Sequence, residues 1–269
     1  MQGEGLDLTR RDPPCVEEFQ TAALPLWREA LVGMDWLSLR ASSVYRGVGV
    51  PHGDGSAVVL VPGALGSDRY LGDMFTWLRR IGYQPYMSAI GRNAECPDLL
   101  TGRLTETVNS AYLETGRKVH LIGHSLGGTL ARSVAVRQPN LVASVITMAS
   151  PFRALRAHPL LLGAVMIVRR RILSEKDAHP DCYSGFWSCE FLHSLGRPLP
   201  DAIVQAAIYT KADGVIDWRC CINDDPATDI EVRGTHLGLV FNPQAYRRIA
   251  GVLASAVEWS QVLADSRPA

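Results

Sequence analysis

The sequence lacks an excess of charge of either sign, a membrane-length apolar run and an apolar segment near its N-terminus. Its 269 residues carry 27 basic and 27 acidic side chains, so the charge gives no reason to expect nucleic acid as a partner. No apolar run reaches the roughly 18 residues that a membrane-spanning helix needs. Residues 1–20 contain Arg10 and Arg11 but no apolar core of a secretory signal. We therefore expect a soluble, cytoplasmic protein.

Strand-like apolar runs alternate with helix-like patterns along most of the chain. The strand-like runs are 57–61, 84–89, 119–123, 141–148, 202–210 and 229–232. The helix-like patterns are 69–81, 99–114, 126–138 and a last one from Asn242-Pro243 onward. Such alternation predicts an α/β fold in which helices cover both faces of a doubly wound, mainly parallel sheet.

Two segments fall outside this alternation and divide the chain. Residues 1–44 are predicted to form an N-terminal helical extension that packs outside the main domain. Its amphipathic helix is expected over residues 17–37, interrupted near Pro25, with Trp27, Leu31 and Trp36 on the apolar face. Residues 153–200 are predicted to be a cap or lid insertion over the carboxyl edge of the sheet, where ligand sites lie in such folds. Residues 45–152 and 201–269 would form the α/β core.

The motif with the most chemical content is Gly123-His124-Ser125-Leu126-Gly127, which lies between a strand-like run and a helix-like pattern. Gly-x-Ser-x-Gly in this setting is typical of a nucleophile elbow, in which a tight turn presents the serine above the end of the sheet. Glycine flanks the serine because larger side chains would collide in the turn. The pattern alone is weak, and the strand before it and the helix after it make Ser125 the candidate nucleophile.

A serine hydroxyl needs a base, and the base needs an acid that orients it. Asp213 follows the strand-like run that ends at Thr210, and Asp217 is its competitor four residues later. His236 lies between the last strand and the last helix and is the candidate base. The other histidines are interpreted as structural: His52, His120, His124, His158, His179 and His193.

Backbone N–H groups are expected to stabilise the oxyanion that forms when a serine attacks a carbonyl. One would come from Leu126, the residue after the nucleophile. The other would come from Ala64, in the Pro62-Gly63-Ala64 loop after the first core strand. The alternative for that loop is an ordinary turn between a strand and a helix.

These pieces occur in the order found in one large family. Residues from about 45 to 260 resemble the α/β-hydrolase superfamily, and within it the small bacterial lipase and esterase type. The matching pieces are 61–66, 122–128, 208–214 with Asp217-Trp218, and Gly234-Thr235-His236. The chain departs from many lipases in having Pro62 where a histidine commonly precedes the oxyanion glycine. Residues 1–44 lie outside the resemblance.

The resemblance implies hydrolysis of small-molecule esters through an acyl-enzyme on Ser125, with Asp213 and His236 as the other members of a triad. No metal or organic cofactor is needed for this chemistry. A thioesterase or an acyltransferase would use the same residues and is the first alternative. A non-catalytic binding protein on the same fold is the second, since a fold does not determine a function.

The insertion holds an apolar run, Leu160–Val168, followed by Arg169, Arg170 and Arg171. The run is too short to cross a bilayer. Because it is apolar on nearly every side, it must be shielded from water. It could be a helix buried in the core, a roof over the pocket above Ser125, or a membrane-surface contact through residues 160–171. We favour the roof, and therefore expect a substrate with a hydrophobic acyl or alcohol part.

Cysteine usage leaves several interpretations open. The six cysteines are Cys15, Cys96, Cys182, Cys189, Cys220 and Cys221. Without an export signal we expect reduced, buried thiols, with a disulfide among the last four as the alternative. The neighbouring His179, Cys182, Cys189 and His193 match no zinc spacing, so no metal site is expected.

Overall fold

A parallel sheet forms the centre of the computed structural model, which describes residues 20–175 and 190–265. Its strands are β2 (Ala57–Val61), β3 (Gln84–Met87), β4 (Val119–His124), β5 (Val142–Met148), β7 (Val204–Tyr209) and β8 (Asp229–Glu231). They lie in the order β3-β2-β4-β5-β7-β8, and every neighbouring pair is parallel. The predicted α/β fold with a doubly wound, mainly parallel sheet is therefore confirmed.

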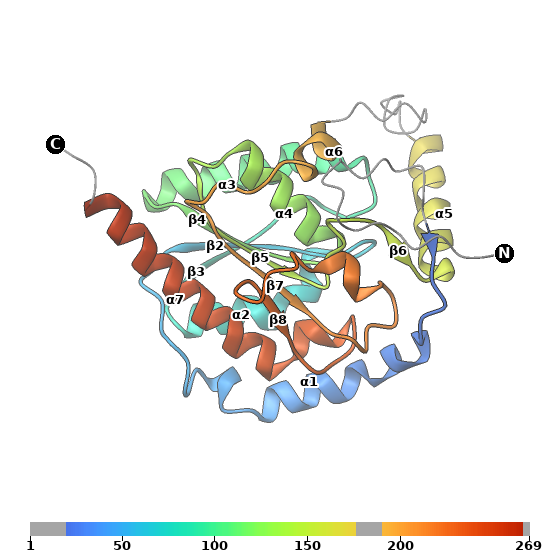
Figure 1. The fold of residues 1–269 in the computed structure, drawn as a ribbon, viewed down its shortest axis with the longest axis horizontal. Helices are drawn as coiled ribbons and strands as arrows, with labels where there is room; N and C mark the ends of the chain where they lie inside the picture. Colours follow the sequence, from blue (N-terminus) through green and yellow to red (C-terminus); the bar gives the residue numbers. More distant parts are fainter. Residues whose placement is uncertain (1–19, 176–189, 266–269) are drawn as a thin grey trace.

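Helices cover both faces of the sheet (Figure 1). The helices on one face are α3 (Pro97–Thr115), α4 (Leu126–Arg137) and α6 (Glu190–Leu195). Those on the other face are α1 (Val32–Ala41), α2 (Gly72–Arg80) and α7 (Pro243–Asp265). The order 3-2-4-5-7-8 requires crossovers in both directions from the centre of the sheet, which is why helices reach both faces.

The central strands are largely apolar, and β2 is apolar throughout, because neither face of the sheet is open to water. Every residue of β2 and β4 is buried. Along β2, Val58 and Leu60 belong to the core beneath α2 and α7, whereas Val59 and Val61 belong to the core beneath α3 and α4. A continuous hydrophobic run thus serves two cores at once.

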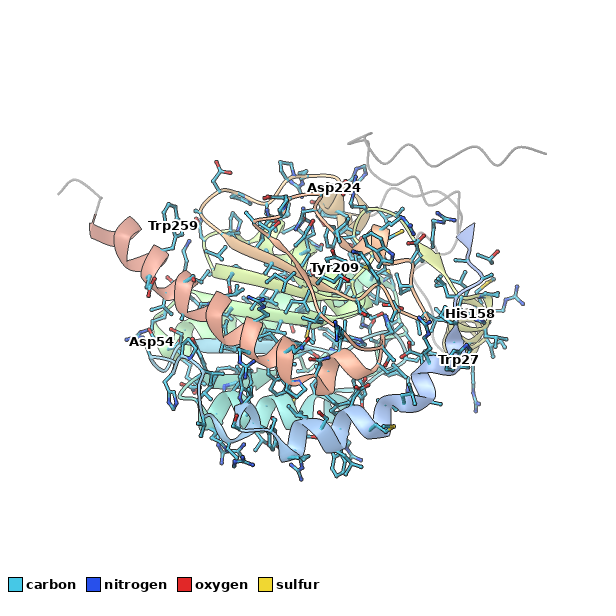
Figure 2. All side chains as sticks on the ribbon, turned by 60° about the horizontal axis from the view of Figure 1, so that its bottom comes forward. Trp27, Asp54, His158, Tyr209, Asp224 and Trp259 are labelled. Carbon is cyan, nitrogen blue, oxygen red and sulfur yellow. The ribbon has the colours of Figure 1, made fainter. Side chains whose placement is uncertain are left out.

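The N-terminal segment is shaped differently from the helix expected over residues 17–37. Described residues begin with β1 (Gln20–Thr21), and the chain then forms a 3₁₀ helix, η1 (Leu26–Leu31), before α1. Pro25 precedes η1, and the tighter 3₁₀ winding rotates the side chains relative to an α-helix. Trp27, labelled in Figure 2, is 71% exposed instead of buried, while Leu39 is fully buried in the same core cluster as Trp77.

The predicted insertion, residues 153–200, separates into parts with different neighbours. Its first part contains β6 (Arg156–Ala157), which pairs in parallel with β1, and α5 (Pro159–Glu175). Leu161 and Leu162 of α5 pack against a small cluster that includes Val215 and Ile216. By contrast α6 packs against α3 and α4 through Phe191, so it belongs with the core helices.

Of the described cysteines, two match the expectation of free, buried thiols and one does not. Cys96 takes part in a disulfide, whereas Cys220 and Cys221 carry free, buried thiols. The alternative of a disulfide among the last four cysteines is therefore wrong for Cys220 and Cys221. Cys15, Cys182 and Cys189 lie outside the described residues. Sequence spacing cannot show which cysteines lie near each other in the fold. Among the described residues, no helix is both long and apolar enough to cross a membrane.

The turn between β4 and α4 is packed closely against neighbouring backbone. A Cβ added to Gly123 would lie 2.4 Å from the backbone of Gly128. One added to Gly127 would lie 2.3 Å from the carbonyl oxygen of Val61, at the end of β2. Since contacts this short would be with backbone atoms, which cannot turn aside, only glycine fits at these positions.

Gly127→Ala should therefore destabilise the protein by about 2 kcal/mol or more, because its methyl group overpacks backbone atoms. Gly102→Ala is the matched control, since Gly102 is exposed in α3 with open space around it. Replacing glycine by alanine in a helix interior should stabilise by up to about 1 kcal/mol. Urea unfolding followed by tryptophan fluorescence measures both changes. Equal effects of the two substitutions would contradict the close packing of the turn.

Candidate active site

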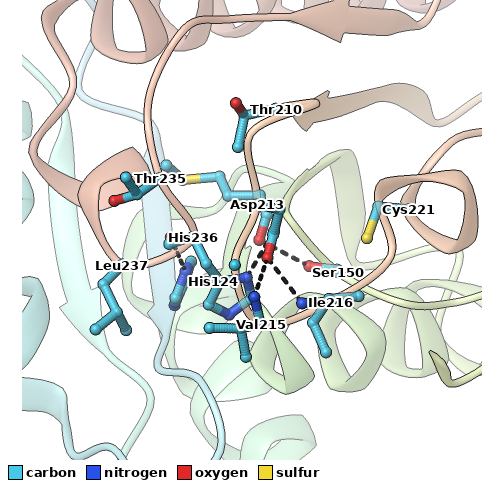
Figure 3. A network of polar contacts seen from close by, with 12 residues as sticks. His124, Ser150, Thr210, Asp213, Val215, Ile216, Cys221, Thr235, His236 and Leu237 are labelled. Carbon is cyan, nitrogen blue, oxygen red and sulfur yellow. Dashed lines mark hydrogen bonds and ion pairs between the residues drawn. The ribbon is translucent and has the colours of Figure 1, made fainter. Parts of the chain in front are cut away.

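Four loops at one edge of the sheet carry the residues singled out from the sequence. Ser125 follows β4, and the loop with Ala64 follows β2. Asp213 follows β7, and His236 follows β8. Because parallel strands end at the same edge, these loops meet there although they are far apart in the sequence. Figure 3 shows Asp213 and His236 side by side, with His124 beneath them.

Ser125 lies at the sharp turn between β4 and α4 with a left-handed backbone, φ 53° and ψ −129°. A side chain in this region of φ is strained, and the strain persists only where surrounding contacts hold the backbone in place. Here the Ser125 N–H donates to the Met148 carbonyl oxygen at 2.8 Å. The Ser125 carbonyl oxygen accepts the Gly128 N–H at 3.0 Å. The hydroxyl is thereby presented at the first turn of α4, where helix N–H groups favour negative charge.

Asp213 and His236 form a buried hydrogen-bonded pair. The distance from His236 Nδ1 to Asp213 Oδ2 is 2.8 Å, and both side chains are almost completely shielded from solvent. The other carboxylate oxygen of Asp213 accepts the N–H groups of Val215 at 2.8 Å and Ile216 at 2.7 Å. Two backbone donors therefore hold the carboxylate in place, and the carboxylate orients the imidazole. With Nδ1 donating its proton to Asp213, Nε2 of His236 is the nitrogen free to accept one.

His124, which the sequence analysis interpreted as structural, contacts His236 directly. Its Nε2 lies 2.9 Å from the His236 carbonyl oxygen, and the two rings are 4.8 Å apart. Burial lowers the pKa of His124 to about 3, so the ring is neutral near pH 7. A carbonyl oxygen only accepts, so Nε2 carries the proton and donates it. His124 therefore fixes the backbone of the candidate base, and no spacing rule pointed to this role.

The loop with Ala64 lies against the serine. A Cβ on Gly63 would be 3.0 Å from the Ser125 Cβ, so this glycine permits the approach. Asn93 braces the loop: its side chain donates to the Pro62 carbonyl oxygen at 2.8 Å, and its carbonyl oxygen accepts the Leu65 N–H at 2.7 Å. A braced backbone beside a nucleophile is the arrangement that an oxyanion site requires.

A cavity of about 370 Å³ opens onto these residues. Its polar wall includes Gly63, Ala64, His124, Ser125 and His236. Its apolar wall is formed by side chains from four parts of the chain: Leu26, Leu160, Leu161, Val215 and Leu237. An apolar cavity with a few polar groups on one side is typical of a small-molecule site.

Asp217, the competing acid, has other partners. Its carboxylate accepts the Arg219 N–H at 3.1 Å as the cap of η5 (Trp218–Cys221) and pairs with the Arg156 guanidinium at 3.3 Å. The remaining histidines make contacts elsewhere: His120 Nδ1 lies 2.8 Å from Ser144 Oγ inside the sheet. Of the possible zinc set, only His193 is in the part of the chain that the structure describes, and no metal-ligating cluster occurs in that part.

Glu29 is a further residue of the site that no sequence pattern indicated. This side chain is only 6% exposed and lines the cavity from η1, outside the segment that carries the resemblance. It accepts hydrogen bonds from the loops of both Asp213 and His236. A single glutamate in an amphipathic segment forms no pattern that could have indicated this contact.

Comparison with known proteins agrees with the fold and the elbow. A family model described as the alpha/beta hydrolase fold matches residues 115–169, the stretch that contains β4, Ser125 and α4. The chain has the α/β-hydrolase fold. A mature lipase of Bacillus licheniformis superposes with a TM-score of 0.52 at 16% identity, over 77% of this chain and 95% of that one. A metagenome-derived lipolytic enzyme superposes with a TM-score of 0.53 at 14% identity, over 78% and 96%.

A triacylglycerol lipase of Pseudarthrobacter phenanthrenivorans is 34% identical over 105 residues. The match covers 36% of this chain and 33% of that lipase, and a triacylglycerol lipase of Burkholderia plantarii matches over a similar share. The chain thus spans about a third of the length of these relatives.

The buried histidines predict how stability depends on pH. Burial lowers the pKa of His120 to about 4 and that of His124 to about 3, from an ordinary value of 6.5. Below pH 6.5 the unfolded chain therefore binds protons that the folded protein does not, and stability falls with pH. Between pH 7 and pH 5 the loss should be roughly 2 kcal/mol for each histidine.

Urea unfolding at a series of pH values measures this loss, and His120→Gln is the matched variant. It removes one of the two groups but leaves a side chain that can still hydrogen-bond Ser144. The variant should lose less stability between pH 7 and pH 5 than the wild type does. An identical pH dependence in both proteins would show that His120 is not the group responsible.

Proposed function

We propose that the protein hydrolyses carboxylic esters through an acyl-enzyme on Ser125. The observation that carries the proposal is the buried Asp213–His236 pair at 2.8 Å, which shares one cavity edge with a serine held in a strained turn. Partly matching relatives named as triacylglycerol lipases support the same reaction class. The fold alone would not, since this fold carries many functions.

In the proposed mechanism Ser125 attacks the acyl carbonyl while Nε2 of His236 takes the hydroxyl proton. Asp213 stabilises the imidazolium that forms, and the N–H groups of Ala64 and Leu126 stabilise the oxyanion. The tetrahedral intermediate then expels the alcohol, which takes its proton from His236. Water repeats the sequence on the acyl-enzyme and releases the acid. Every step uses side chains and backbone groups of this chain.

The cavity favours a substrate with a hydrophobic acyl or alcohol part. Leu160 and Leu161, from the first turn of α5, line it opposite the polar wall. We propose that α5 is the cap of the site. The α/β core would then consist of residues 45–152 and 201–269, on either side of the insertion. The segment 160–171 predicted as a possible membrane contact lies in this helix, and Ile167 within it is 70% exposed.

The nucleophile is tested by a fluorophosphonate, which phosphonylates activated serines. The adduct should map to Ser125 by mass spectrometry. Ser125→Ala should abolish labelling and lower kcat towards p-nitrophenyl esters of graded chain length on the order of 10⁶-fold. Ser110→Ala, on the exposed face of α3, is the control and should keep full activity. A label on another serine, or activity retained by Ser125→Ala, would rule out this nucleophile.

The orienting acid is tested by comparing Asp213→Asn with Asp217→Asn. Asparagine at 213 would favour the wrong tautomer of His236, so kcat should fall on the order of 10⁴-fold. Asparagine at 217 should keep kcat but weaken the η5 cap and the Arg156 pair, with a stability loss of about 1 kcal/mol. Steady-state kinetics and urea unfolding separate the two effects. The reverse result would transfer the acid role to Asp217.

A further inference from the structure

The carboxylate of Glu29 accepts hydrogen bonds from two loops that are distant from η1 in the sequence. Its Oε1 accepts the Gly214 N–H and the His236 N–H, both at 3.0 Å, and its Oε2 accepts the Leu237 N–H at 2.8 Å. Gly214 is the residue after Asp213. One carboxylate therefore binds the loop of the candidate acid and the loop of the candidate base at the same time.

The glycines of these loops show how closely the N-terminal segment approaches. A Cβ on Gly214 would lie 2.7 Å from the Pro25 carbonyl oxygen and 2.9 Å from Glu29 Oε1. A Cβ on Gly238, two residues after His236, would lie 2.0 Å from Asp35 Oδ2. Each loop thus has a residue without a side chain where η1 or α1 packs against it.

His236 is consequently held from three directions. Its N–H donates to Glu29, its carbonyl oxygen accepts from His124, and its ring donates to Asp213. The following residue is also held, since the Tyr70 hydroxyl donates to the Leu237 carbonyl oxygen at 2.6 Å. A general base needs this kind of restraint, since a displacement of about 1 Å can cost on the order of 100-fold in rate.

The charge of Glu29 acts in the same direction as its hydrogen bonds. Proton transfer from the serine makes the imidazole of His236 positive, and a nearby carboxylate stabilises that cation. The titratable groups around His236 are Asp213, Glu29, Asp35, Tyr70 and His124. Burial and then the charge of Glu29 raise the pKa of Asp35, so the Glu29 charge is felt in this region.

We propose that Glu29 is a positioning residue for the reaction: it joins the Asp213 and His236 loops and supplies a second negative charge behind the base. The proposal rests on the proposed function of the site. It also assigns a role to the N-terminal segment, which the α/β core resemblance leaves out.

The test uses Glu29→Gln and Glu29→Asp in the full chain, with Asp73→Asn as the matched control. Glutamine has the same size but only one acceptor oxygen, so its amide cannot accept all three N–H groups of the two loops as the two carboxylate oxygens do, and it carries no charge. Aspartate keeps the charge on a shorter stem. Asp73 holds the same N-terminal segment, through Trp36 and Arg40, without touching either loop.

For Glu29→Gln we expect kcat for p-nitrophenyl butyrate to fall on the order of 10-fold to 100-fold, with a smaller change in KM. The acidic limb of the pH–rate profile should move to lower pH, because losing the charge makes the imidazolium less favourable. Glu29→Asp should keep the acidic limb in place with an intermediate kcat. Asp73→Asn should lower the melting temperature and leave kcat and the limb unchanged.

A Glu29→Gln protein that is only less stable, with the kcat and acidic limb of the wild type, would overturn the proposal. NMR titration of the His236 ring in the wild type and in Glu29→Gln gives a readout that needs no activity. A wild type without esterase activity and without fluorophosphonate labelling would refute the proposed function. The shift of the His236 titration would still decide whether Glu29 acts on the base.

Discussion

The site depends on a backbone contact between the end of β2 and the first turn of α4. Gly127 lies against the carbonyl oxygen of Val61, and this contact leaves no room for a side chain. It places the turn that carries Ser125 beside the loop that carries Ala64. The nucleophile and one candidate oxyanion donor are therefore neighbours because two glycine-containing segments pack backbone to backbone, not because their side chains attract each other.

Buried negative charge is a second constraint, and backbone N–H groups satisfy it. Asp213 accepts two such groups besides His236, and Glu29 accepts three. Burying a carboxylate without partners is very unfavourable, so each of these bonds is needed for folding as well as for geometry. The loops that close around the carboxylates acquire a defined shape as a result. Stability and preorganisation of the site thus have the same physical origin.

The fold was readable from the sequence because its signals are local. Continuous apolar runs predict strands covered on both faces, and the runs ending at Val61 and Met148 correspond to β2 and β5. Proline and asparagine marked the start of α7 at Pro243. The positions of Ser125, Asp213 and His236 followed from the order of strands and loops, and the structure brings all three to one edge of the sheet.

Contacts that link distant segments through backbone groups could not be predicted from the sequence. Neither the 3₁₀ winding of η1 nor the exposure of Trp27 follows from hydrophobic periodicity, because Pro25 changes the local geometry. The contact of His124 with the loop of His236 was not predicted, since its partner there is a carbonyl oxygen and not a side chain. The disulfide at Cys96 was missed because proximity in the fold leaves no trace in cysteine spacing.

The position of Glu29 near the start of the chain has a consequence for how the protein is made. Its bonded partners at Gly214 and His236 lie 185 and 207 positions later in the sequence. Closing so long a loop costs only slightly more entropy than closing one of half the length, but contacts of high sequence separation form slowly. The chain of η1 is synthesised before that of β7 and β8, so the Glu29 carboxylate can gain these partners only after both strands have been made. The surroundings of His236 are therefore completed only after most of the described chain has been synthesised.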